Sequence, residues 1–210
     1  RRPLLPSCRP LLPTRRARVK STLEPQVAKA LLRAEYADLF AVLGMHPMEE
    51  GVVVRVFRPD GAAVRILARG QEAATYQAVR THPEGIFEAQ IAGQQELFAY
   101  KLEVVDHQGE TRRSRDPYSF WPQFNPDDQY LFNEGTHYQA YEVLGAHLRQ
   151  VDGVDGTYFA VWAPRARRVS VVGDFNQWDG RLHCMRPLGV AGLWEIFVPE
   201  VTPGNPYKYE

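Results

Sequence analysis

Hydrophobic and polar positions alternate along most of the chain, in short runs that turn residues separate. The runs are rich in β-branched and aromatic side chains: VVVRVF, AAVRIL, TYQAV, GIFEAQI and FAYKLEVV within residues 52–105, then GTYFAVWA, RRVSVVG, GLWEIFV and NPYKYE within residues 156–210. The intervening segments, such as RPDG, THPEG and AGQQ, carry Gly, Pro, Asp and Gln. Runs of this kind predict β-strands with one buried and one polar face.

One segment has a helical rather than an alternating pattern. In residues 24–44 the apolar positions recur at helical intervals: Val27, Leu31, Leu32, Leu39, Phe40 and Leu43. Pro25 suits the first turn of a helix and Gly44 suits its end. The pattern predicts one short helix before the first strand.

The chain repeats itself once, at an interval of 101 to 107 residues. Four pairs of segments match in the same order: FAVLGMH (40–46) with YEVLGAH (141–147), VFRPDGAAV (56–64) with VWAPRARRV (161–169), GIFE (85–88) with GLWE (192–195), and YKLE (100–103) with YKYE (207–210). A period this long means that the repeating unit is a whole domain. About 100 residues per copy, all in short strands, predicts an all-β fold of two tandem immunoglobulin-like β-sandwiches.

The repeat and the composition together divide the chain into four segments. We expect a disordered basic tail at 1–23, a helix plus the first sandwich at 24–124, a linker at 125–138 and the second sandwich at 139–210. The second copy stops after YKYE, where the first continues into VVDHQGETRRSRDPYSF. We therefore expect the second sandwich to be incomplete, strained or prone to pairing with another chain, and the sequence to be a fragment.

Charge is distributed unevenly between the tail and the body of the chain. Residues 1–23 carry seven basic residues and no acidic one, whereas the rest carries 25 acidic and 18 basic residues. Pro-rich RPLLP repeats in the tail do not build a helix or a core, although a targeting or anion-binding arm stays an alternative to a disordered leader. The acidic body argues against nucleic-acid binding.

The length of the apolar runs and the spacing of the cysteines indicate where in the cell the protein is expected. No run reaches the roughly 18 apolar residues that a membrane span needs. The only cysteines, Cys8 and Cys184, have no metal-ligand spacing and form no disulfide framework, which indicates a reducing compartment such as the cytoplasm.

Two long segments carry a family resemblance. YLFNEGTHYQAYEVLGAH (130–147) and GTYFAVWAPRARRVSVVGDFNQWDG (156–180) closely resemble the N-terminal region of bacterial glycogen branching enzymes, and the resemblance covers residues 34–210. It implies an all-β domain followed by a family-48 carbohydrate-binding module. It also implies a catalytic (β/α)8 barrel, to be contacted within the same molecule, that cuts an α-1,4-glucan and rejoins it through an α-1,6 bond.

The sequence offers no catalytic residue. A (β/α)8 barrel takes about 250 residues, and no alternation of strands and helices occurs here. Retaining glycosidic chemistry needs two carboxylates held about 5 Å apart, and the adjacent Asp127 and Asp128 are better explained as a linker pair. We expect the chain alone to be inactive and to need no cofactor or metal. His46 and His147, which recur after Leu-Gly, are expected to be structural, and Cys184 an inert thiol.

The turn GDFNQWDG (173–180) supplies the candidate binding residues. A flat indole at Trp178 can cover the apolar face of a pyranose ring, while Asn176, Gln177 and Asp179 can bind its hydroxyl groups. The resemblance adds Lys208, because modules of this family carry a Lys in the matching strand. The alternative is that Trp178 packs on its own domain or on the barrel. The first copy reads ARGQEA (68–73) at this place, which argues against a need for the aromatic in folding and favours a spacer role for that copy.

The other aromatic residues are assigned to packing. Trp162 aligns with Phe57 and Trp194 with Phe87, so all four are expected in the cores. Phe175 is expected to fill the base of the turn, and one cluster is expected to hold the two domains together: Tyr118, Phe120, Trp121 and Phe124.

Two other functions remain open on the residues alone. The chain could be a stand-alone, non-catalytic scaffold module on glycogen, which an incomplete final sandwich disfavours. It could also be the same region of a debranching or trehalose-forming amylase, which the duplication and YLFNEGTHY disfavour.

Overall fold

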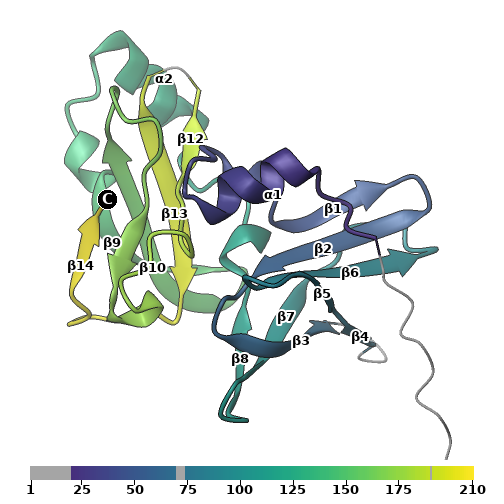
Figure 1. Cartoon of the computed structure of the whole chain (residues 1–210). Coiled ribbons are helices and arrows are strands. Elements are labelled where there is room, and N and C mark those ends of the chain that lie inside the picture. Colours follow the sequence, from purple (N-terminus) through teal and green to yellow (C-terminus); the bar gives the residue numbers. More distant parts are fainter. Residues whose placement is uncertain (1–19, 70–73, 190) are drawn as a thin grey trace, which may run out of the picture.

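A computed structural model describes residues 20–69, 74–189 and 191–210, which form two β-sandwich units (Figure 1). In the first unit, two four-stranded antiparallel sheets have the orders β1-β2-β6-β5 and β4-β3-β7-β8. Its elements are α1 (Pro25–Leu32), η1 (Leu39–Ala41), β1 (Gly44–Met48), β2 (Gly51–Phe57), β3 (Gly61–Ala68), β4 (Thr75–Gln77), β5 (Val79–His82), β6 (Ile86–Ala92), β7 (Tyr100–Asp106), β8 (Thr111–Arg115) and η2 (Pro117–Ser119).

The second unit pairs a four-stranded sheet, β12-β13-β10-β9, with a two-stranded sheet, β11-β14. Its elements are α2 (Pro126–Glu134), η3 (Ala140–Glu142), β9 (Gly145–Val151), β10 (Val154–Trp162), β11 (Val171–Gly173), η4 (Asp174–Asn176), β12 (Arg186–Leu188), β13 (Leu193–Pro199) and β14 (Tyr207–Tyr209). The prediction of an all-β chain of two tandem immunoglobulin-like sandwiches is confirmed.

The duplication extends to strand order and to individual hydrogen bonds. The sheet β1-β2-β6-β5 of the first unit returns as β9-β10-β13-β12 in the second, and the pair β3–β7 returns as β11–β14. His46 Nε2 lies 2.9 Å from the carbonyl oxygen of Leu43, and His147 Nε2 lies 2.9 Å from that of Leu144. The two histidines therefore have the structural role that the sequence predicts.

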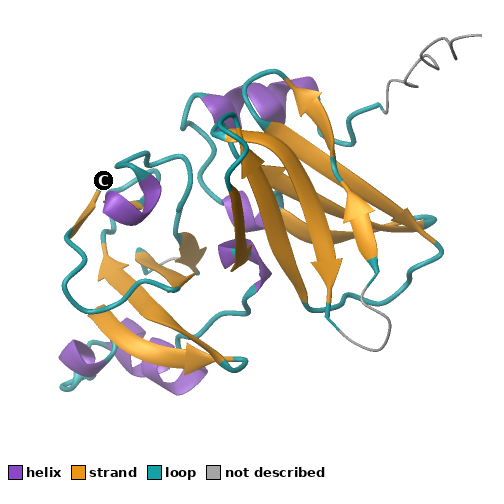
Figure 2. Ribbon diagram, turned by 90° about the horizontal axis from the view of Figure 1, so that it is seen from below, coloured by secondary structure: helices purple, strands orange, loops and turns teal. Residues whose placement is uncertain are grey.

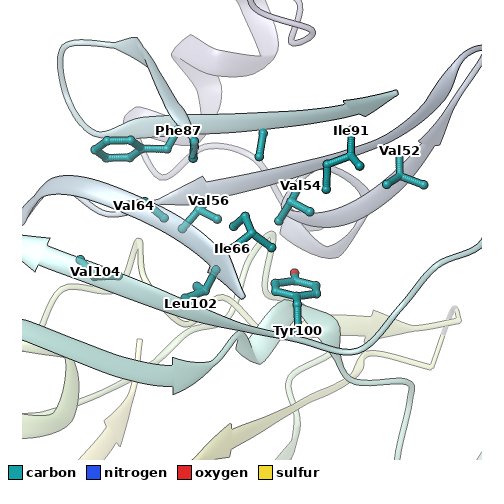
Figure 3. Close-up of a cluster of buried hydrophobic side chains, with 12 residues drawn as sticks. Val52, Val54, Val56, Val64, Ile66, Phe87, Ile91, Tyr100, Leu102 and Val104 are labelled. Carbon is teal, nitrogen blue, oxygen red and sulfur yellow. The ribbon is translucent and has the colours of Figure 1, made fainter. Parts of the chain in front are cut away.

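The first core lies between the two sheets of the first unit (Figure 3). It is built from alternate residues of β2, β3, β6 and β7: Val52, Val54, Val56, Val64, Ile66, Phe87, Ala89, Ile91, Tyr100, Leu102 and Val104. The opposite face of β2 and β6 is buried as well, because Phe57 and Ile86 pack beneath α1. Burial on both faces explains why β2 reads as a nearly continuous apolar run.

A second helix, α2, lies within the segment expected as a linker. The Asn125 side chain accepts a hydrogen bond from the Asp127 N–H at 3.0 Å, Pro126 opens the first turn and Gly135 ends the helix at φ 73°. These are ordinary capping signals. Pro126 follows Pro25 by 101 residues, so the repeat begins at the helix.

The two units contact each other through α1 and the segment before β12. In Figure 1, α1 (purple) lies between β12 and β13 of the second unit and β1 and β2 of the first. Its buried Leu31 belongs to one apolar cluster with Cys184. The Tyr118 hydroxyl donates to the Leu182 carbonyl at 3.2 Å and accepts from the Cys184 N–H at 3.1 Å. Figure 2, seen from below, shows the strands of the two units as separate bodies joined by loops and short helices.

The aromatic predictions are partly confirmed. Trp194 and Phe87 are buried in the cores, and Phe175 packs beside Phe159 at the base of the turn. The core role predicted for Trp162 is wrong, because its side chain is 56% exposed whereas that of Phe57 is 4% exposed. The indole lies edge-on to Phe132, with 6.0 Å between ring centres, and its N–H donates to the Ala191 carbonyl at 3.0 Å.

The interdomain cluster is also only partly confirmed. Tyr118 bonds across the junction, and Phe120 and Phe124 are buried in the second unit. Trp121, however, is 74% exposed and therefore does not hold the two domains together. Cys184 is a buried free thiol, and its burial raises the pKa of that thiol, as expected of an inert group.

Two expectations about the ends of the chain are only partly covered by the structure. The basic tail at 1–23 falls almost entirely on residues 1–19, outside the described residues. The sheet β11-β14 has two strands where the first unit has four, because no strand in residues 20–69, 74–189 and 191–210 corresponds to β4 or to β8. In those same residues, no helix is long and apolar enough to cross a membrane.

Candidate functional site

The turn of residues 173–180 leaves β11 through η4 and reverses direction at two residues with positive φ. Gln177 and Trp178 have φ of 56° and 61°, in the left-handed region that side chains other than Gly seldom adopt. Successive residues in this conformation cost free energy, which the surrounding contacts must offset. Gly173 is required at the start of the turn, because a Cβ there would lie 2.5 Å from both the Phe175 ring and the Pro206 carbonyl oxygen.

Trp178 stands at the tip of this turn with its ring held in place. Its side chain is 44% exposed, and the indole N–H donates to Asp174 Oδ1 at 2.8 Å. Its backbone N–H donates to the Gly173 carbonyl at 2.9 Å. The indole is therefore half-exposed and oriented, as a stacking platform must be.

Asn176 lies inside the turn rather than on its surface. Its amide oxygen accepts the Gly173 N–H at 2.9 Å, and its amide nitrogen donates to the Val171 carbonyl and contacts His183 Nδ1, both at 2.9 Å. Burial and the nearby charge of Arg58 lower the pKa of His183 to about 3, which keeps the ring neutral. The side chain of Asn176 is 2% exposed, so the structure corrects the expectation that it binds a ligand hydroxyl: it holds the turn.

The other three candidate residues lie at the surface. Gln177 is exposed beside Trp178. Asp179 is half-buried; burial alone would raise its pKa, but hydrogen bonds from Arg181 hold the pKa below its usual value. Lys208 is exposed on β14 and pairs with Val172 of β11, beside the strand that leads into the turn. Gln177, Trp178 and Asp179 thus lie together on one turn, and Lys208 lies on the strand that pairs with β11.

In the first unit the segment ARGQEA corresponds to this turn. Its residues 70–73 lie outside the described residues. Lys101, the counterpart of Lys208, is exposed on β7 and pairs with Leu67 of β3.

Asp174 is a further candidate site residue that the sequence patterns did not indicate. It fixes the indole four residues later, and only the short spacing of an acid and a Trp in one turn could have signalled this contact. Within residues 20–69, 74–189 and 191–210, no cluster of three or more His, Cys, Asp or Glu side chains could hold a metal ion. Asp127 and Asp128 lie in the first turn of α2, where Asp128 pairs with His137 at 3.0 Å.

Comparison with known proteins agrees with this architecture. Residues 24–118 match the family model of the alpha-1,4-glucan branching enzyme GlgB N-terminal domain, and residues 143–210 match carbohydrate-binding module 48, the isoamylase N-terminal domain. The fold and the turn thus define the chain as a tandem β-sandwich accessory region that ends in a carbohydrate-binding module.

Three curated relatives identify the family more closely. The 1,4-alpha-glucan branching enzymes GlgB of Myxococcus xanthus and Paramagnetospirillum magneticum are each 48% identical, over 86% and 87% of the chain. That of Methylococcus capsulatus is 43% identical over 86%. The chain belongs to this family as its N-terminal region, and it spans 24% of the length of each relative. A solved pullulanase from Anoxybacillus sp. LM18-11 aligns with 79% of the chain and 23% of its own, at 18% identity and a TM-score of 0.26.

Proposed function

We propose that this chain binds an α-1,4-glucan, such as glycogen or amylose, at the Trp178 turn and positions it for the catalytic domain of a branching enzyme. The observation that carries the proposal is the half-exposed indole, which Asp174 and the left-handed backbone hold at a fixed angle. The match of residues 143–210 to a carbohydrate-binding module supports it.

The chemistry of the turn suits a neutral sugar chain. Each pyranose ring offers an apolar face of C–H groups and a rim of hydroxyl groups. The indole of Trp178 covers such a face with little loss of side-chain entropy, because it is already held. The exposed amide of Gln177 and the ammonium of Lys208 are then available to the hydroxyl rim, and the Asp179 carboxylate offers a third, partly exposed partner.

The reaction itself belongs, in this proposal, to the rest of the parent protein. The parent transfers a segment of an α-1,4-glucan to form an α-1,6 branch, and we assign no catalytic residue to the present chain. We expect the chain alone to be inactive. A cytoplasmic setting for this work is supported by the buried free thiol of Cys184.

Aromatic residues on the second unit suggest where the catalytic domain packs. Phe40 and Phe57 of the first unit are covered by guanidinium groups of the second, those of Arg186 at 3.9 Å and Arg181 at 5.4 Å from the ring centres. Their counterparts, Tyr141 and Trp162, are 70% and 56% exposed. We propose that the catalytic domain covers these two rings, as the second unit covers the first.

The glucan site is tested by comparing two exposed tryptophans. Trp178→Ala should weaken the binding of maltoheptaose to the full chain about tenfold, the loss of roughly 1.4 kcal/mol of stacking. Trp162→Ala is the matched control, because it also removes a half-exposed indole, and it should leave the affinity unchanged. Titration calorimetry measures both affinities, and circular dichroism checks that each variant folds. Equal affinities of Trp178→Ala and the unsubstituted chain would remove Trp178 from the site.

A further inference from the structure

A cleft of about 720 Å³ lies between the two units. From the first unit it is lined by the β2–β3 turn, β8 and η2, and from the second by residues of the Trp178 turn, residues 181–183 and residues 198–201. Its volume is within the range of about 300–1,000 Å³ that small-molecule sites occupy. The first unit therefore contributes one wall of a cavity that is large enough for a ligand.

The cleft adjoins the stacking platform. Trp178 itself is not among the lining residues, but its neighbours Gln177 and Asp179 are. Asp174 lines the cleft as well, and its Oδ1 accepts the indole N–H of Trp178 at 2.8 Å. The platform and the cleft thus share one turn, so a sugar chain that stacks on the indole has the cleft beside it.

The charges that line the cleft are balanced. Five arginines and five acidic residues line it, so neither sign is in excess. His183 adds no charge, because burial and the nearby Arg58 lower its pKa to about 3. The exposed carboxylate of Glu200 opposes an anion, and the exposed guanidinium of Arg112 opposes a cation. The lining therefore suits a neutral ligand with many hydroxyl groups, each of which donates and accepts hydrogen bonds.

Each unit places one two-pronged Arg–Asp pair in the cleft. On the first unit, Arg58 donates to Asp60 at 2.9 Å from Nε and 2.6 Å from Nη2. On the second, Arg181 donates to Asp179 at 3.0 Å from Nε and 2.7 Å from Nη2. The four side chains are between 23% and 32% exposed. Because these bonds use Nε and Nη2, Nη1 of each guanidinium lies outside its pair and can donate to a hydroxyl group.

The pair on the second unit is held in place by contacts on two sides. The Arg181 guanidinium lies 5.4 Å from the centre of the Phe57 ring of the first unit. The Arg181 backbone N–H also donates to Asp179 Oδ1, at 2.9 Å. Polar groups that are already fixed in this way lose little side-chain entropy when a ligand binds.

We propose that an α-1,4-glucan chain stacked on Trp178 continues into this cleft, where Arg58 and Asp60 of the first unit bind its hydroxyl groups. The first unit then takes part in glucan binding and is more than a spacer. A bound chain contacts both units and stabilises their relative position. The inference rests on the proposed function, because the chain begins on Trp178. It adds that the site binds a glucan several residues long and that the first unit contributes to this preference.

Chain length tests the cleft separately from the platform. Maltotriose is long enough to occupy the platform, whereas maltoheptaose also reaches the cleft, so the full chain should bind maltoheptaose about tenfold more tightly. Arg58→Ala and Asp60→Ala should each weaken the binding of maltoheptaose about threefold and leave that of maltotriose unchanged. Trp178→Ala should weaken the binding of both sugars. Titration calorimetry measures the affinities, and circular dichroism checks that each variant folds.

Arg65→Ala is the matched control for the first unit. Arg65 also pairs with a carboxylate of that unit, that of Glu103, but lies outside the cleft. This variant should bind both sugars as tightly as the unsubstituted chain does. A higher salt concentration should leave the affinity for maltoheptaose unchanged, because the ligand carries no charge for salt to screen.

Three outcomes would overturn the proposal. The first is equal affinity of the unsubstituted chain for maltotriose and maltoheptaose, which needs no substitution to be decisive. The second is maltoheptaose binding that Trp178→Ala weakens but that Arg58→Ala and Asp60→Ala leave unchanged. This result would confine the glucan to the platform and keep the proposed function. The third is binding of both sugars that Trp178→Ala leaves unchanged, in which case the proposed function fails as well.

Discussion

The two units of this chain share one plan and differ in what covers them. Each begins with a Pro-capped helix, continues through a 3-10 turn and a Leu-Gly corner, and pairs its strands in the same order. Each also buries a glutamate at the same position of the repeat, Glu88 and Glu195, 1% and 2% exposed. Both glutamates accept backbone N–H groups of the segment that leads into their unit, at Thr22 and at Phe124, each at 2.8 Å.

The difference lies on the helix side of the sheet β1-β2-β6-β5 and of its counterpart β9-β10-β13-β12. Phe40 and Phe57 of the first unit are covered by the second unit, whereas the equivalent Tyr141 and Trp162 of the second unit are exposed. The repeat therefore reproduces the fold but not the environment of equivalent side chains. An aromatic residue at one position of the repeat can be core in one copy and surface in the other.

The largest expected effect separates Phe57 from Trp162. Phe57→Ala should destabilise the chain by about 3 kcal/mol, because it removes a buried ring from the cluster under α1. Trp162→Ala should cost less than about 1 kcal/mol, since most of the indole is already in water. Urea denaturation followed by far-ultraviolet circular dichroism measures both changes.

Repeating the denaturation of both variants at low and high protein concentration provides the control. If Trp162 were covered by a second copy of the chain, its substitution would cost more at high protein concentration than at low. Equal losses for Phe57→Ala and Trp162→Ala at every concentration would contradict the contrast between the two units.

Acid should destabilise the second unit more than the first as pH falls below 6.5, because burial lowers the pKa of His183 strongly, whereas the pKa of the half-buried His46 in the first unit is lowered less. The neutral, buried His183 has its pKa lowered to about 3 from 6.5, so the unfolded chain binds a proton that the folded chain excludes. This contribution to stability is lost as pH falls below 6.5, by about 1.6 kcal/mol between pH 6.5 and 5. In the first unit, burial would raise the pKa of Glu88, but hydrogen bonds from Ser21, Thr22 and Thr81 lower it below 4.5. That contribution is therefore lost only as pH falls through still lower values.

Tryptophan fluorescence separates the two units in this experiment, because all four tryptophans, Trp121, Trp162, Trp178 and Trp194, belong to the second unit or its entry segment. The unfolding midpoint in urea should fall between pH 6.5 and 5. His183→Gln should flatten that decline, whereas His147→Gln should keep it. A decline of the same slope in His183→Gln would assign the pH dependence to another group.

Sequence patterns predicted the strands, the duplication and the family, because alternation and collinear matches are properties of the chain itself. The capping residues of α2 are recognisable in the sequence. The helix was not predicted, because its apolar residues do not recur clearly at helical spacing. The exposure of Trp162 and Trp121 could not be predicted from the sequence. It depends on which parts of the folded chain pack against each side chain. At the turn, residue types indicated the exposed Trp178, whereas only the folded backbone shows that Asn176 turns inward and that Asp174 holds the indole.

The smallest predicted effect concerns the orientation of the indole. Asp174→Ala should weaken maltoheptaose binding about threefold, or roughly 0.65 kcal/mol, because the ring of Trp178 gains freedom that binding must remove. Stability should change little, since Asp174 is exposed. Asp155→Ala is the matched control: Asp155 is also an exposed acid that accepts one side-chain hydrogen bond, from Gln150 at 2.9 Å, but lies away from the turn. If Asp174→Ala binds as well as this control while Trp178→Ala does not, the left-handed backbone alone orients the platform.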